Sequence, residues 1–230
     1  MIEELRRSSA HVFVDDLEKV RLGDDDRHHL GAVLRLRRDE PVTCSDGQGG
    51  WVPARWDGDD VAVVGAPQRT EAPGRIRTIA VAPMKGDKVE LVVEKTVEIG
   101  IDQIVVLSPT AHTVVRWSPD KQDALMERYR RIARAASMQS RRLFLPRIVG
   151  PGDISDLRGM VAALGRIGWA EPGGGASVAD IDTLVVGPEG GWSPGELAAA
   201  DTLVDLGPSV LRAETAAIVG AALMVAHSRR

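Results

Sequence analysis

The sequence is short of several residue types, and each shortage excludes a class of protein. It has one cysteine, Cys44, so no internal disulfide can form, which fits a reducing compartment. No apolar run is long enough to cross a bilayer, and the acid-containing N-terminal segment lacks the apolar core of a signal peptide. The adjacent His28 and His29 point in different directions, and no histidine has partners at metal-ligand spacing. We therefore expect a cytoplasmic protein with no membrane partner and no metal.

The usual phosphate-binding patterns are also missing. The segment LVVGPEGGWSPGE, which begins at Leu184, lacks both the Gly-Lys-Ser/Thr ending of a P-loop and the spacing GxGxxG. Its apolar triplet predicts a strand covered on both faces, and Ser193, Pro194 and Glu196 predict a helix that begins at Pro194. Glu189 would repel phosphate. The loop between is either an ordinary tight turn or a site for a neutral or cationic ligand.

The N-terminal part of the chain has the pattern of a small β domain. Short β-type runs between Ala10 and about Gly65 are separated by the turn-forming dipeptides Asp46-Gly47 and Asp57-Gly58. We expect a mostly antiparallel barrel with one short helix. The apolar residues of that helix recur at helical spacing: Leu30, Val33 and Leu34. The Pro- and Gly-rich segment 65–75 predicts a linker.

After the linker the pattern changes to alternating strands and helices. A strand over 76–82, a helix over 87–99 and a further strand directly after it predict a βαβ unit. Two later apolar runs, DTLVVGP and DTLVDLGP, both stop at Gly-Pro. This part is therefore expected to be α/β with a parallel sheet, from about Arg75 to Arg230. The last helix is apolar nearly all round over 216–226, so it is buried in the core or against a second subunit.

Positive charge is concentrated in one segment, although the net charge of the chain is −4. A helix over 120–141 is predicted to bury one apolar face and to present arginines on the other, which either faces solvent or contacts phosphate. No acid interrupts the following arginines: Arg128, Arg130, Arg131, Arg134, Arg141, Arg142 and Arg147.

Five segments, taken together and in order, resemble the RsmE family of 16S rRNA uracil-N3 methyltransferases. They are RHHLGAVLRL, KGDKVELVVEKTVEIGI, SMQSRR, VVGPEGGWSPGE and LGPSVLRAETAA, and they extend over nearly the whole chain. The resemblance implies a PUA-like RNA-binding β-barrel over 1–72 and a SPOUT α/β domain with a deep trefoil knot over 73–230. It also implies a homodimer. Two positions depart from the family: Ser209, where relatives commonly carry Arg, and the segment SMQSRR, in which only Gln139, Ser140 and Arg142 match.

The family implies S-adenosyl-L-methionine as cofactor, and its cationic sulfonium suits a glycine loop that carries a carboxylate. The substrate implied is 16S rRNA, expected within the assembled small ribosomal subunit. The residues expected to bind the cofactor, largely through the backbone, are Gly187, Gly190, Gly191, Leu206, Gly207, Val210, Leu211 and Ala216. Those expected to bind RNA are Arg35, Arg37, Gln139, Arg141 and Arg142.

Two residues are candidates for catalysis. Uracil N3 is protonated at neutral pH, so a fixed cation that stabilises negative charge on the flanking carbonyl oxygens would help its proton leave. Arg212 matches the family motif and is assigned this role, unless it pairs structurally with Glu214 or Glu189. Glu189 is a weaker candidate for the base. Two alternatives stay open: ribose or guanine methylation by a related SPOUT enzyme, and a non-catalytic rRNA-binding assembly factor.

Overall fold

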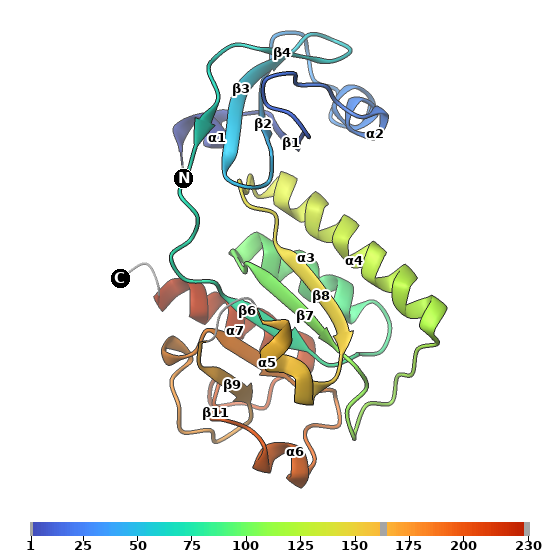
Figure 1. Cartoon of the computed structure of the whole chain (residues 1–230), viewed down its shortest axis with the longest axis vertical. Helices are drawn as coiled ribbons and strands as arrows, with labels where there is room; N and C mark the ends of the chain where they lie inside the picture. The colour runs from blue at the N-terminus through green and yellow to red at the C-terminus, as the bar shows by residue number, and fades with distance from the viewer. Residues whose placement is uncertain (1, 162–164, 228–230) are drawn as a thin grey trace. The chain divides into compact units, whose positions relative to one another are not determined.

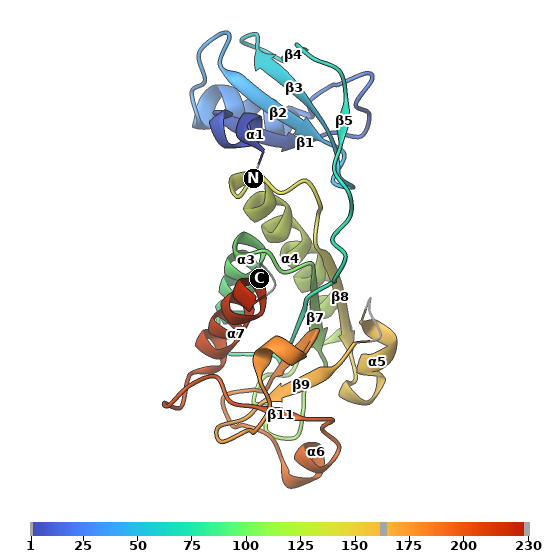
Figure 2. The same ribbon diagram turned by 90° about the vertical axis from the view of Figure 1, so that its left-hand side faces the viewer.

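The computed structural model describes residues 2–161 and 165–227. Residue 1, residues 162–164 and the last three residues of the predicted C-terminal helix, 228–230, lie outside the described residues. The chain divides into two compact units (Figures 1 and 2). Unit 1 comprises Met1–Pro73 and Ser137–Leu145, and unit 2 comprises Gly74–Ala136 and Pro146–Arg230. Unit 1 is therefore built from two stretches of sequence that are far apart.

Unit 1 is built around one β-sheet. Its strands are β1 (Ala10–Phe13), β2 (Pro41–Ser45), β3 (Gly50–Trp56), β4 (Val61–Val63) and β5 (Gln68–Arg69). They are ordered β1-β2-β3-β4, with β5 also paired to β3. The β1–β2 pair is parallel and the others are antiparallel, so the sheet is mostly antiparallel, as the sequence predicts. Three short helical segments accompany the sheet: α1 (Glu3–Arg7), α2 (Asp24–His28) and the π-helical η1 (His29–Val33).

The two predicted hairpin turns of this sheet are confirmed. In the turn after β2, the Asp46 Oδ1 atom accepts hydrogen bonds from the backbone of Gln48 and Gly50 at 2.7 and 2.9 Å. In the turn after β3, Asp57 does the same for Asp59 and Asp60, at 3.0 and 2.9 Å. Each aspartate thus supplies the acceptor that its turn lacks in the backbone, which is why Asp-Gly marks both turns.

The structure adds a strand to unit 1 and corrects its predicted helix. The predicted linker over 65–75 contains the boundary between the two units, after Pro73, but its first part forms β5, which pairs with Gly50 and Trp51 of β3. A two-residue edge strand has too little pattern to be recognised. Val33 and Leu34 are not buried with Leu30 but are 58% and 44% exposed. The backbone N–H of Leu34 bonds to the His29 carbonyl, five residues back, so this turn is wider than an α-helix and helical spacing does not apply.

The segment Ser137–Leu145 belongs to unit 1 through several contacts. Leu143 is buried with Leu5 and Trp51, and its carbonyl accepts a hydrogen bond from the backbone of Gly49 at 2.9 Å. The buried ring of His11 lies between Thr43 Oγ1 and the Arg142 carbonyl, at 2.8 and 2.9 Å. The segment Ser137–Leu145 thus completes the packing of unit 1.

Unit 2 contains a parallel six-stranded sheet, as predicted. Its strands are β6 (Thr78–Val81), β7 (Gln103–Leu107), β8 (Arg147–Gly152), β9 (Ile167–Ala170), β10 (Thr183–Val186) and β11 (Leu203–Val204). They are ordered β11-β9-β10-β6-β7-β8, and each pairing is parallel. The last two strands in sequence therefore lie on either side of β9.

Helices cover both faces of this sheet. They are α3 (Lys88–Ile99), α4 (Pro119–Gln139), η2 (Ile154–Asp156), α5 (Leu157–Met160), η3 (Val178–Asp180), α6 (Pro194–Ala198) and α7 (Ala213–His227). Side chains of α3, α4 and α7 share one core with Leu184 and Val186, while those of α5 and α6 share another with Val185. Because both faces are buried, the triplet at 184–186 is apolar without alternation.

Helices α3 and α7 form where the sequence predicts them. Helix α3 has Asp87 as its N-cap and ends at Gly100, whose φ of 118° is left-handed. Helix α7 packs closely on the sheet, because a Cβ atom at Gly220 would lie 2.1 Å from Leu184 Cδ2. The predicted core position of the last helix is thus confirmed for its buried face. Within the described residues, no helix is long and apolar enough to span a membrane.

Candidate functional site

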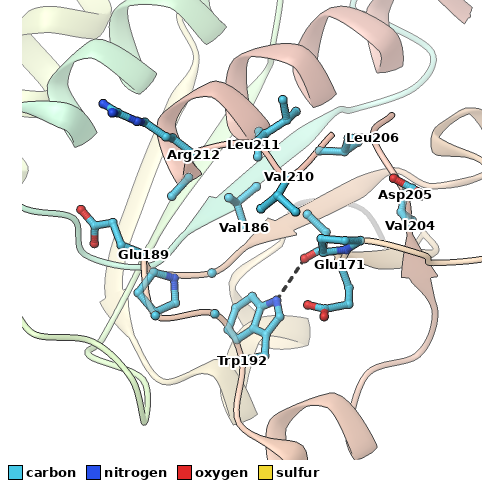
Figure 3. Close-up of a pocket in the computed structure, with 18 of the residues that line it drawn as sticks. Glu171, Val186, Glu189, Trp192, Val204, Asp205, Leu206, Val210, Leu211 and Arg212 are labelled. Carbon is cyan, nitrogen blue, oxygen red and sulfur yellow. Dashed lines mark hydrogen bonds between the residues drawn. The ribbon is translucent and has the colours of Figure 1, made fainter. Parts of the chain in front are cut away.

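A pocket of about 620 Å³ lies in unit 2, where β9, β10 and β11 end (Figure 3). The carboxyl ends of parallel strands meet at one edge of a sheet, and the loops that follow them form binding crevices there. Here the loops after β9 and β10, the loop over 205–212 and the first turns of α7 line the walls. The segments that meet in this pocket are thus distant in sequence.

Most of the predicted cofactor residues line this pocket. They are Gly187, Gly190, Gly191, Leu206, Val210, Leu211 and Ala216. Gly207 does not line it, but its backbone N–H bonds to Asp205 Oδ1 at 3.0 Å and its φ is 143°, so it shapes the same loop. Ser209, at the position that departs from the resembled family, is an exposed lining residue. The assignment of these residues to a cofactor stays a prediction.

The glycine loop after β10 leads directly into α6. Ser193 Oγ accepts a hydrogen bond from the backbone of Glu196 at 3.3 Å, and the Glu196 carboxylate accepts one from the backbone of Ser193 at 2.7 Å. This reciprocal cap, with Pro194 in the first turn, confirms the predicted helix start. Gly191 has a φ of 70°, a left-handed conformation that glycine adopts without strain.

One wall of the pocket is apolar and includes the indole of Trp192. The indole Nε1 donates to the Ala170 carbonyl at 3.2 Å, and its ring centroid lies 4.6 Å from that of Trp169. A Cβ atom at Gly187 would lie 2.9 Å from this ring, so a larger residue at position 187 would clash with the indole. Figure 3 shows Val186, Trp192 and Val210 around the same space. Such a wall suits a flat, largely apolar group.

Charged side chains stand on two sides of this apolar wall. Figure 3 shows Glu171 and Asp205 on one side, and Glu189 and Arg212 on the other. Glu189 Oε1 lies 3.1 Å from Lys88 Nζ and accepts a backbone hydrogen bond from Lys85 at 3.3 Å. Burial alone raises the pKa of Glu189, but the backbone hydrogen bonds and Lys88 outweigh it, so the pKa lies below its usual range. Glu189 is therefore a fixed anion and a weak proton acceptor.

Arg212 has no carboxylate partner among the described residues. Glu189 and Glu214, which the sequence offers as structural partners for Arg212, instead lie 3.1 and 3.4 Å from Lys88 Nζ. Arg212 itself is exposed and lines the pocket. Its guanidinium is thus available to a bound molecule, as the predicted catalytic role requires.

The predicted RNA-binding residues all lie in unit 1, and none lines the pocket. Arg35, Arg37 and Gln139 are exposed. Arg141 is half-buried, and its guanidinium donates to the carbonyl and hydroxyl oxygens of Ser8 at 2.6 and 3.2 Å. Arg142 is half-buried, and its carbonyl bonds to His11, as described above. Arg141 thus has a structural role that the sequence pattern does not predict.

The arginine face of α4 is less uniform in space than in sequence. Arg128 pairs with Glu90 of α3 at 2.7 Å, and Arg130 lies 3.6 Å from Glu127. Glu90 lies far away in the sequence, so the acid-free run of arginines does not mean an acid-free surface.

The lining residues that sequence patterns missed include Lys88, Glu171, Trp192 and Asp205. Glu171 and Asp205 directly follow strands β9 and β11, so their positions at carboxyl ends of parallel strands were the available signal. No metal-binding group of three or more His, Cys, Asp or Glu residues occurs in the part of the chain that the structure describes.

Comparison with known proteins gives consistent matches. Residues 70–225 match the family model described as an RNA methyltransferase domain. Ribosomal RNA small subunit methyltransferase E of Mycobacterium bovis is 31% identical over 216 residues, which cover 85% of this chain and 81% of that protein. Its namesake from Synechocystis is 28% identical, covering 85% and 69%.

A solved structure supports the same fold. The crystal structure of ribosomal RNA small subunit methyltransferase E from Neisseria gonorrhoeae, bound to S-adenosyl methionine, superposes with a TM-score of 0.80. The match covers 94% of this chain and 96% of that one, at 24% identity. The mixed α/β fold is therefore shared over almost the full length of both chains.

Proposed function

The chain belongs to the family of ribosomal RNA small subunit methyltransferase E, and from this premise we propose that it methylates N3 of a specific uridine in 16S rRNA with S-adenosyl-L-methionine as donor. The observation that carries the proposal is the convergence of the glycine loop, the 205–212 loop and the start of α7 on one pocket of about 620 Å³. Arg212, which has no carboxylate partner in the part of the chain that the structure describes, lies in its lining.

The pocket fits this cofactor better than it fits a phosphate-bearing one. Its apolar wall of Val186 and Trp192 suits an adenine ring, and the backbone of the glycine loop offers hydrogen-bonding groups without side chains between. The carboxylates of Glu171, Glu189 and Asp205 favour a cation and disfavour phosphate. The residues that would hold the cofactor are the predicted ones that line the pocket, with Gly207 shaping the same loop. When bound, S-adenosyl-L-methionine supplies a methyl group activated by positive charge on sulfur.

The protein groups act mainly by alignment and electrostatics. Methyl transfer needs the nitrogen in line with the methyl carbon, and a rigid pocket supplies that alignment. Arg212 is assigned the stabilisation of negative charge that develops on the uracil carbonyl oxygens as N3 loses its proton. Glu189 remains the weaker candidate base, since its ion pair with Lys88 favours the ionised but poorly basic form.

The finer architecture and the partners are part of the same proposal. We assign the range 1–72, to which the structure adds Ser137–Leu145, to a PUA-like RNA-binding barrel, and the rest of 73–230 to a SPOUT domain with a deep trefoil knot. The insertion of β10 between β9 and β6 supports the second assignment. Exposed Arg35, Arg37 and Gln139 support rRNA binding in the assembled small subunit. The family resemblance is what supports a homodimer. The location that fits this substrate is the cytoplasm.

The test is methylation of small ribosomal subunits from a strain that lacks this modification. Arg212→Ala is expected to lower turnover by roughly 10²- to 10³-fold, the effect of removing one preorganised charge-stabilising donor. Calorimetry is expected to show unchanged binding of S-adenosyl-L-methionine. Arg166→Ala is the matched control, because Arg166 is an exposed arginine of unit 2 that does not line the pocket. Near-normal turnover of Arg212→Ala would remove Arg212 from the mechanism.

The same experiment separates the alternative functions. Mass analysis of the modified nucleoside distinguishes N3-methyluridine from a methylated ribose or guanine. A protein that binds small subunits but neither methylates them nor binds the cofactor in calorimetry would be an assembly factor. Mapping the modified base then identifies the uridine.

A further inference from the structure

Lys88 occupies an unusual position at the start of α3. Its ammonium lies between two carboxylates, 3.1 Å from Glu189 Oε1 and 3.4 Å from Glu214 Oε2. Glu189 belongs to the glycine loop after β10, whereas Glu214 belongs to the first turn of α7, directly after the 205–212 loop. One side chain thus joins the two segments that carry the predicted cofactor residues.

The three side chains are partly shielded from water. Their exposed fractions are 29% for Lys88, 33% for Glu189 and 13% for Glu214, so each carboxylate has lost much of its hydration. The backbone N–H of Lys85 adds a second contact from the same segment to Glu189. Without the ammonium, two neighbouring carboxylates would repel each other, and the loops that carry them would move apart.

A second lysine of the same helix shows what is special about this arrangement. Lys95 also contacts two carboxylates, Glu94 at 2.7 Å and Glu98 at 2.9 Å. Both of those belong to α3 itself, so the Lys95 pairs connect nothing beyond one helix. Each of the two lysines forms ion pairs with two glutamates. Lys88 connects two separate segments, whereas Lys95 connects residues of its own helix.

We propose that Lys88 is a positioning residue for cofactor binding, which fixes the glycine loop against the first turn of α7 before the cofactor arrives. It acts through Glu189 and Glu214 and takes no part in the transfer of the methyl group. Preorganisation of this kind increases affinity, because binding no longer has to order the loops. The inference rests on the proposed function, since the ligand is the cofactor assigned there.

The test uses S-adenosylhomocysteine, the demethylated product, with the full-length protein. This probe carries no sulfonium, so the added negative charge of a Lys88 variant does not offset the loss of loop order. Titration calorimetry is expected to give about tenfold weaker binding for Lys88→Met, no more than about twofold for Lys95→Met, and near wild-type binding for Lys88→Arg. Thermal unfolding of the two Met variants without ligand is expected to be similar.

A pH series separates positioning from a general loss of structure. In Lys88→Met the two carboxylates have lost their cation, so protonation relieves their repulsion and affinity is expected to recover as the pH falls from 7 toward 5. Wild-type affinity is measured at each pH as the reference, because the His112 ring, 3.1 Å from the Gly190 carbonyl of the same loop, is common to both proteins. Glu189→Gln removes the same bridge, so adding Lys88→Met to it is expected to cost little more.

The outcomes distinguish this inference from the proposed function. Equal affinities for Lys88→Met and Lys95→Met, or additive losses in the double variant, would overturn the role of Lys88. Absence of binding to the wild-type protein would instead count against the cofactor assignment itself.

Discussion

His11 gives a prediction about stability whose size follows from the structure. The imidazole is 3% exposed and lies 2.8 Å from Thr43 Oγ1 and 2.9 Å from the Arg142 carbonyl. Burial lowers the pKa of His11 from 6.5 to about 4, a hydrogen bond to the Arg142 carbonyl opposes that change, and the charge of Arg141 adds to it. The ring is therefore neutral in the folded protein at any pH well above 4.

The direction of the pH effect follows from that difference. Between about pH 4 and 6.5 the unfolded chain binds the proton and the folded chain does not, so acid favours unfolding. The stability present above pH 6.5 is lost as the pH falls through this window. At about 1.4 kcal/mol for each pH unit, the full loss reaches about 3 kcal/mol, of which about 2 kcal/mol is gone by pH 5. That is a large share of the stability of a small domain.

The assay is urea unfolding followed by tryptophan fluorescence at pH 7.5 and pH 5. His11→Gln replaces a well-packed buried ring, so it is expected to be less stable than wild type at pH 7.5. Because glutamine cannot take up a proton, this variant is expected to lose about 2 kcal/mol less of its stability on acidification. His28→Gln is the control, because His28 is exposed. If wild type and His11→Gln lose the same stability between the two pH values, then the buried ring does not control acid sensitivity.

Three further predictions concern the pocket, the thiol and RNA. Gly187→Ala places a Cβ atom 2.9 Å from the Trp192 ring and is expected to weaken S-adenosylhomocysteine binding in calorimetry by about tenfold. Gly195→Ala, which meets open space, is expected to have no effect. Cys44 is fully buried and burial raises its pKa to about 12, so a thiol reagent at pH 8 is expected to label only the urea-unfolded protein. Binding of a 16S rRNA fragment is expected to weaken steeply with salt, and a flat titration would exclude arginine–phosphate contacts.

Local signals in the sequence predicted local structure well. The strand, glycine loop and capped helix over 184–198 were predictable because Ser193 and Glu196 satisfy backbone groups of their own turn. The Asp-Gly turns were predictable for the same reason. The strand β5 and the π-helical turn after His29 were not, because a two-residue edge pairing and a wider helical turn leave no periodic pattern.

The electrostatic partners were the least predictable part of the site. Sequence spacing places Arg212 near Glu214, yet in the structure Glu214 forms an ion pair with Lys88. In the same way, the arginine run on α4 has no acid within it, yet Glu90 reaches Arg128 from α3. Both pairings depend on how distant helices and loops meet, which no short window of sequence records.

The discontinuity of unit 1 has a consequence for how the protein is made. Leu143 packs with Leu5 and Trp51, and its carbonyl accepts a hydrogen bond from the backbone N–H of Gly49. A ribosome synthesises Leu5 and Trp51 long before Leu143. The packing of unit 1 therefore stays incomplete, with the Trp51 indole uncovered, while residues 74–136 of unit 2 are translated. A gene fragment that ends after Pro73 would encode a unit 1 that can never complete this packing.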